Sequence, residues 1–203
     1  PQHTRRRCAP VAAWFTGVPP KAHHGSIVLL SSPLVARKPM HTRRVEYQAY
    51  ERDDGLWDIE ARLIDVKPFD CPLESGVRPG GTPIHDMWVR ITIDDDLTIV
   101  AAEAASSQVA YPGYCDRINP AYSKLVGLNL LMSFRRRVGE LFGGIEGCTH
   151  ITEMLGMLPT AAIQSNYRKP LDEATKPFQL DHCHALVTTG AAVILFWVKT
   201  AAA

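Results

Sequence analysis

Cys148-Thr149-His150 is the first stretch whose side chains could perform chemistry. It follows a glycine-rich turn and should open a helix. The positive end of a helix dipole stabilises a thiolate, so Cys148 could be a nucleophile with His150 or His184 as its base. A small buried cysteine beside a capping Thr149 explains the same residues without any reaction.

Asp181-His182-Cys183-His184 is a second cluster of reactive side chains. A zinc site would need His184 or Cys183 to meet Cys148 and His150 in space, and the paired spacing typical of zinc sites is missing. We therefore expect no metal. His184 is instead a candidate for proton transfer beside a carboxylate, with a structural histidine as the alternative.

A third group surrounds His85 and Asp86. The alternation of the chain places His85 on an apolar strand face with Met87, and Asp86 with Arg90 on the opposite face. His85 and Asp86 are candidate catalytic residues at a polar pocket beneath helices. The alternatives are a hydrogen-bonded core histidine and cross-strand ion pairs on the other face, the latter with Asp58, Glu60 and Arg62.

Several common kinds of site are absent from the sequence. It contains no phosphate-binding glycine loop, dinucleotide fingerprint or Gly-x-Ser-x-Gly elbow, so we expect no cofactor. Lys and Arg number 22 against 21 for Asp and Glu, which argues against a nucleic-acid partner. The sequence contains no apolar run of about 18 residues, the length that would suggest a membrane span. Five cysteines without a secretion signal favour the reducing cytoplasm.

Two predicted hairpins position His85, Asp86 and the charged residues near them. Residues 43–67 alternate between apolar and polar side chains around Asp53-Asp54-Gly55, which has the composition of a turn. Residues 84–106 do the same around Asp94-Asp95-Asp96. Two successive hairpins predict an antiparallel sheet of about four strands with one face covered.

Helices should cover that face. The pattern predicts helices over about 119–131, with Asn119 as N-cap, over about 134–141, and from about 149, divided at Pro159. Strands followed by helices indicate an α+β fold. We expect an irregular arm over residues 1–40, one α+β domain over 41–200, and a cloning scar in the alanines 201–203.

Four blocks of the sequence, in order, carry a family resemblance. They are Asp54-Gly55-Leu56-Trp57 onward to Leu63, Pro83 to Asp94, Gly147 to His150, and Leu180 to Ala185, with His41-Thr42-Arg43-Arg44 as the opening. The chain resembles a bacterial domain-of-unknown-function family, number 2889, over about residues 41–198. The resemblance implies that these blocks form one domain, found in Gram-negative bacteria with broad aromatic catabolism.

Polar clusters without a cofactor signature favour a cofactor-independent lyase. Acid/base side chains would drive retro-aldol cleavage, elimination or decarboxylation of a small aromatic compound. The expected catalytic residues are His85, Asp86, Cys148, His150 and His184; the expected substrate-binding residues are Trp57, Trp88 and Tyr114 in an aromatic pocket, with Arg62 or Arg90 as an anion clamp. The alternatives are a hydrolase with Cys148 as nucleophile and a non-catalytic ligand-binding or zinc-containing domain. The unassigned arm suggests a homodimer.

Overall fold

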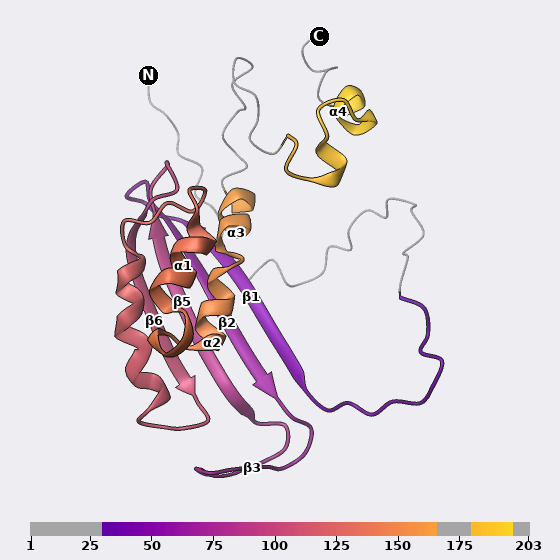
Figure 1. The fold of residues 1–203 in the computed structure, drawn as a ribbon, viewed down its shortest axis with the longest axis vertical. Helices are drawn as coiled ribbons and strands as arrows, with labels where there is room; N and C mark the ends of the chain where they lie inside the picture. Colours follow the sequence, from indigo (N-terminus) through magenta and orange to yellow (C-terminus); the bar gives the residue numbers. More distant parts are fainter. Residues whose placement is uncertain (1–29, 166–179, 197–203) are drawn as a thin grey trace. The chain divides into compact units, whose positions relative to one another are not determined.

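The computed structural model describes residues 30–165 and 180–196 (Figure 1). The chain divides into two units, Pro1–Lys38 and Pro39–Ala203. Of the first unit, residues 30–38 are described, and they form no helix or strand and are exposed. The strands and helices that the structure describes belong to the second unit. Residues 1–29 of the expected irregular arm and the alanines 201–203 lie outside the described residues.

A four-stranded antiparallel sheet is the base of the second unit. Its strands are β1 (Thr42–Glu51), β2 (Trp57–Val66), β5 (Pro83–Ile93) and β6 (Ile99–Gln108), in the order β1-β2-β5-β6. Gly55 closes the first hairpin at a φ of 85°, a conformation that suits glycine. In the second turn, Asp94 Oδ1 accepts hydrogen bonds from the backbone of Asp96 and Thr98. The predicted sheet of two hairpins is confirmed.

Between the two hairpins the chain forms a further pair of short strands, β3 (Cys71–Leu73) and β4 (Gly76–Arg78). They pair only with each other. The prediction of two hairpins did not include this pair, because three-residue strands are too short to show alternation.

Helical segments follow the sheet: η2 (Cys115–Leu125), α1 (Phe134–Phe142), η3 (Gly144–Glu146), α2 (Thr149–Leu155) and α3 (Leu158–Ser165). Two more, η4 (His184–Leu186) and α4 (Ala191–Phe196), lie near the C-terminus. The expected helices at 134 and 149 are confirmed, and Pro159 lies in the first turn of α3, where the helical path is divided.

The predicted helix over 119–131 is wrong in type and in bounds. The segment is a 3-10 helix, η2, that starts at Cys115 and ends at Leu125. Asn119 does not cap it, since its side chain pairs with Ser106 of β6. Beyond the end, Gly127 donates its N–H to the carbonyl of Ile99, so the backbone joins the edge of the sheet instead of continuing as a helix.

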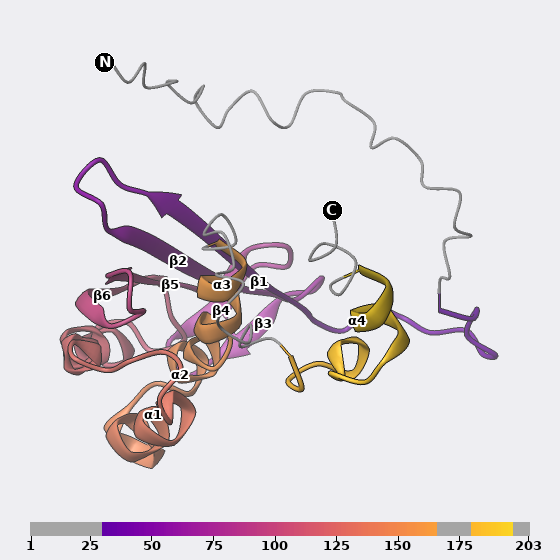
Figure 2. The same ribbon diagram turned by 90° about the horizontal axis from the view of Figure 1, so that it is seen from above.

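One face of the sheet is buried under α1, α2 and η2, which lie on the same side in Figure 2. Alternate residues of β2 and β5 fill this core: Ile59, Ala61, Leu63, Met87, Val89 and Ile91 are at most 1% exposed. Fully burying each of these side chains except Ala61 stabilises the fold by about 1.5–3 kcal/mol. This confirms an α+β fold with helices on the sheet.

Strand register places the polar end of this inner face. Arg43 of β1 lies opposite Asp65 of β2, and Asp65 lies opposite His85 of β5. Asp65 and His85 are in phase with the buried residues of β2 and β5 at a spacing of two, and Arg43 lies directly opposite Asp65, so the three side chains share the face that α2 covers. No helix in the part of the chain that the structure describes has the length and apolarity to cross a bilayer.

Candidate active site

Asp65 is the centre of the candidate site and is only 3% exposed. Its Oδ1 accepts hydrogen bonds from His41 Nε2 and Arg43 Nε, both at 2.8 Å, and its Oδ2 accepts one from Arg43 Nη2 at 2.8 Å. Burial alone would raise the pKa of Asp65, but the hydrogen bonds from Arg43, His41 and His85 outweigh burial and lower the pKa to about 2. The carboxylate is therefore ionised at neutral pH.

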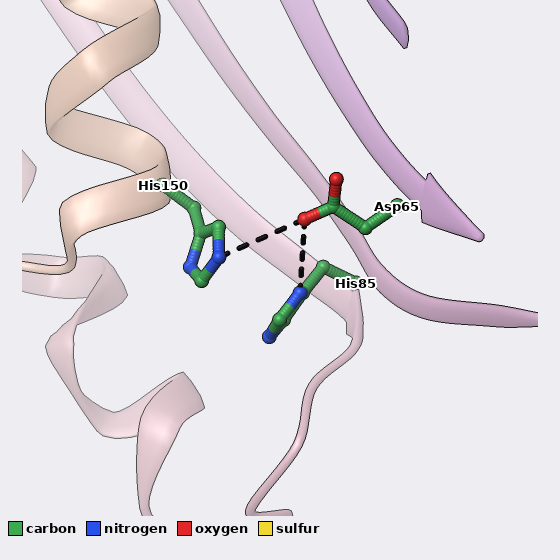
Figure 3. A group of neighbouring side chains, drawn as sticks. All are labelled: Asp65, His85 and His150. Carbon is green, nitrogen blue, oxygen red and sulfur yellow. Dashed lines mark hydrogen bonds and ion pairs between the residues drawn. The ribbon is translucent and has the colours of Figure 1, made fainter. Parts of the chain in front are cut away.

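Two imidazoles face this carboxylate from different elements (Figure 3). His85 Nδ1 lies 3.1 Å from Asp65 Oδ2, and His150 Nε2, from α2, lies 3.7 Å from the same oxygen. The two ring centroids are 3.9 Å apart. Burial is the main cause that lowers the pKa of both histidines, and Arg43 lowers each further. Both rings are therefore neutral at pH 7.

The ionised carboxylate selects the tautomer of His85. A carboxylate can only accept, so a neutral His85 donates its Nδ1–H to Asp65 and keeps the lone pair on Nε2. The His85 side chain is 15% exposed and that of His150 is 25% exposed, so both rings reach solvent. An imidazole pair of this kind can accept and return a proton.

Cys148 stands beside this pair at the start of α2. Its Sγ lies 3.8 Å from His150 Nδ1. The buried Tyr122 fixes this end of the helix, because its hydroxyl accepts a hydrogen bond from the Cys148 N–H at 2.8 Å and lies 3.0 Å from Thr152 Oγ1. Cys148 and His150 thus keep fixed positions relative to the sheet.

The structure brings His85, Cys148 and His150 together, as expected, but not Asp86. The Asp86 carboxylate lies on the opposite face of the sheet and accepts hydrogen bonds from Arg62 Nε at 2.9 Å and Nη2 at 2.8 Å. Asp65 takes the orienting position that the sequence assigned to Asp86. His184 is exposed in η4 and, among the described residues, is not part of the group around Asp65.

The expected substrate-binding residues do not gather at this cluster. Trp57 begins β2, eight residues from Asp65, which is about 27 Å along a strand. Trp88 and Arg62 pack together on the opposite face, where Arg62 Cζ lies 4.5 Å from the centroid of the Trp88 ring. On that face Arg90 pairs with Glu60 and Glu103. Tyr114 is 75% exposed before η2. The cross-strand ion pairs considered as the alternative are what the outer face contains.

Asp65, Arg43 and His41 are the site residues that the sequence reasoning missed. Asp65 continues the inner-face alternation of residues 57–63, which was the available signal for its orientation. Arg43 and His41 stand in the opening His41-Thr42-Arg43-Arg44, which carried the family resemblance without any chemical role.

Asp65, His85 and His150 are also the described residues that could reach one metal ion, with ligand atoms within 4.8 Å of one another. Their types would suit zinc. Arg43, however, already neutralises the Asp65 carboxylate through both oxygens, and His41 occupies a further acceptor position. Charge balance therefore favours an ion-paired carboxylate that orients imidazoles.

Fold and site together define an α+β domain that holds an ionised carboxylate against two neutral imidazoles. The family model "Protein of unknown function (DUF2889)" matches residues 41–164, and the chain belongs to this family. The resemblance drawn from the sequence is thus confirmed. No curated protein and no solved structure matches the chain.

Proposed function

We propose that the protein is a cofactor-independent lyase that acts by acid/base catalysis on a small aromatic compound. One observation carries the proposal: a buried, ionised Asp65 faces two neutral imidazoles, of which His85 presents its lone pair on Nε2. Catalysis of this kind needs a base near neutrality whose orientation is fixed.

In a retro-aldol cleavage, His85 Nε2 would remove the proton of a substrate hydroxyl. A carbonyl forms at that carbon as the C–C bond breaks, and the electron pair goes to the carbon attached to the activated ring system. The imidazolium of His85 returns its proton to that carbon, directly or relayed through His150, so both rings end neutral and protons and electrons balance. Elimination makes the same demand on the base, whereas decarboxylation needs only the proton donor, because loss of CO2 leaves an electron pair on carbon.

The test replaces His85 and His150 separately with Ala and follows aldehyde release from a panel of β-hydroxylated phenolic compounds. We expect each substitution to lower turnover by about 10²–10⁴-fold, the usual contribution of a general acid or base. His182→Ala is the matched control, because His182 is an exposed histidine outside the cluster. Folded His85→Ala and His150→Ala proteins with normal turnover would contradict the proposal.

A second candidate is the hydrolase with Cys148 as nucleophile. It is favoured by one observation: His150 lies between Cys148 Sγ at 3.8 Å and Asp65 Oδ2 at 3.7 Å, the order of a thiol, base and orienting carboxylate. The Cys148→Ala variant discriminates between the two candidates. A hydrolase would lose ester cleavage and its inactivation by iodoacetamide, whereas the lyase retains turnover.

The remaining expectations belong to the same proposal. A role in aromatic catabolism and a cytoplasmic location would follow from a lyase of this substrate class and from cysteines that stay reduced. Cys71, Cys115, Cys148 and Cys183 are all free thiols. The homodimer stays a prediction, which sedimentation of the purified protein would test.

A further inference from the structure

Arg43 of β1 joins two further elements of the candidate site, β2 and α2. Its Nε and Nη2 donate to the two oxygens of Asp65 on β2, and its Nη1 donates to Glu153 Oε2 on α2 at 2.7 Å. Each guanidinium nitrogen therefore has a protein acceptor. An arginine used in this way fixes the groups around it.

We propose that Arg43 is the positioning residue of the Asp65–His85–His150 cluster, holding the carboxylate ionised and fixed in front of both imidazoles and tying α2 to β1 and β2. The role as a positioning residue rests on the proposed acid/base function. The hydrogen-bond geometry carries the inference: a planar bidentate pair sets the plane of the Asp65 carboxylate, and the third bond sets the helix that carries His150.

Charges around the imidazoles come from each element packed there. His41 and Arg43 approach from the start of β1, Asp65 from β2, and Cys148 and Glu153 from α2. The α3 sequence (Leu158–Ser165), which packs against β1, contains no titratable residue. Arg43 is thus the cation that offsets Asp65 in the field at both rings, and it lowers the pKa of each.

Nuclear magnetic resonance of the histidine rings tests this without a substrate. Long-range proton–nitrogen spectra report the tautomer and titration midpoint of each ring, assigned with His85→Gln and His150→Gln. In Arg43→Gln we expect both midpoints to move to higher pH, because a positive charge is removed, and His85 to lose its single Nδ1–H tautomer. Turnover should fall on the order of 10- to 100-fold, as when an orienting contact is lost.

Arg43→Lys separates positioning from simple stability. Lysine keeps the charge but is a point donor, so we expect the midpoints to return toward wild type while the tautomer stays mixed. Arg52→Gln is the matched control. Arg52 is exposed to a similar extent and also bridges two carboxylates, Asp54 at 2.7 Å and Asp58 at 3.2 Å, at the other end of the hairpin. The Arg52→Gln substitution should leave the titration midpoints and tautomers of His85 and His150 unchanged.

Unchanged midpoints and tautomer in a folded Arg43→Gln protein would overturn the inference. If that variant does not fold, Glu153→Gln replaces it: loss of this anion should lower the His150 midpoint, and an unmoved midpoint would count against the network. The two proposals fail separately. If His85→Ala keeps normal turnover while the histidine titration midpoints shift in Arg43→Gln, only the lyase is rejected. If His85→Ala is inactive while the midpoints in Arg43→Gln do not move, only the positioning role is rejected.

Discussion

At the scale of single residues, Asp65 shows how a charge is kept inside the molecule. A buried carboxylate loses its hydration, and only charged or strongly polar donors can replace that loss. Arg43 supplies a bidentate pair, and His41 and His85 supply one contact each. The carboxylate is consequently part of the stability of the fold as well as of the candidate site.

Asp65→Asn should destabilise the protein at neutral pH. The pKa falls from 3.8 to about 2 on folding, which corresponds to about 2 kcal/mol of unfolding free energy. Because the folded pKa is the lower one, this stabilisation is present above pH 3.8 and is lost as pH falls toward 2. Urea unfolding of wild type and variant at pH 7 and pH 3 checks this.

The difference in unfolding free energy between wild type and Asp65→Asn should be smaller at pH 3 than at pH 7. Asp54→Asn serves as the control, since Asp54 also pairs with an arginine but lies on the exposed turn, and it should change stability little. An Asp65→Asn protein as stable as wild type at pH 7 would show that the ion pairs contribute nothing net.

His85 and His150 predict a loss of stability on mild acidification. Burial lowers the pKa of both rings, so below pH 6.5 the unfolded chain takes up protons that the folded chain does not. Stability should therefore fall as pH drops below 6.5, by up to about 1.4 kcal/mol per pH unit for each ring, until the folded rings protonate. His85→Gln and His150→Gln should each flatten the dependence between pH 7.5 and 5, and an unchanged slope would contradict the lowered pKa.

Sequence reasoning found the two imidazoles but not their carboxylate. His85 and His150 stood out because histidine in an apolar or helix-opening context is unusual. Asp86 was chosen as a neighbour in sequence, although adjacent strand residues point to opposite faces. The carboxylate had to come from the next strand, and strand register depends on pairing that one sequence does not show.

At the scale of elements, α2 decides whether the site exists, since it carries His150 over the sheet. Its N-terminal end is fixed by Tyr122 of η2, which is fully buried. The Tyr122 hydroxyl accepts from the Cys148 N–H, donates to the Cys148 carbonyl at 3.1 Å, and contacts Thr152 Oγ1. The phenol therefore supplies an acceptor for the Cys148 N–H, which the short helix leaves unpaired, whereas the Cys148 carbonyl also accepts from the Thr152 N–H.

Tyr122→Phe should lower the free energy of unfolding by about 1–3 kcal/mol, because the ring stays buried while the Cys148 N–H loses its acceptor. Chemical denaturation measures the change. Tyr111→Phe, at a half-exposed tyrosine, is the control and should leave stability within about 0.5 kcal/mol. A Tyr122→Phe protein that matches this control would mean that water replaces the hydroxyl at no cost.

Strands and helices were predicted correctly where the apolar periodicity was long, and wrongly where tertiary contacts determined the type of element. The ten-residue alternation of β2 and the eleven residues of β5 identified the sheet. η2 contains Asn119-Pro120, a good helix start, yet Asn119 pairs with Ser106 and the segment follows β6 as a 3-10 helix. That outcome depends on tertiary packing, which local propensity does not contain.

At the scale of the whole molecule, one continuous core supports the site. Its buried members run from Ile59 to Ala162, contributed by β2, β5, β6, η2, α1, α2 and α3. The family model covers nearly the same stretch, residues 41–164. A core confined to this stretch should fold without the chain on either side.

A fragment of residues 39–165 should therefore unfold cooperatively with the same thermal midpoint as the full chain, and its His85 and His150 rings should titrate as they do there. A fragment of residues 39–157 is the matched control. It lacks α3 and with it Leu158 and Ala162, both fully buried, so its unfolding free energy should be lower by about 3 kcal/mol or more. Calorimetry measures both. If the 39–165 fragment were as unstable as the shorter one, the stretches outside it would have to contribute to the core, and the boundary inferred from the buried residues would be wrong.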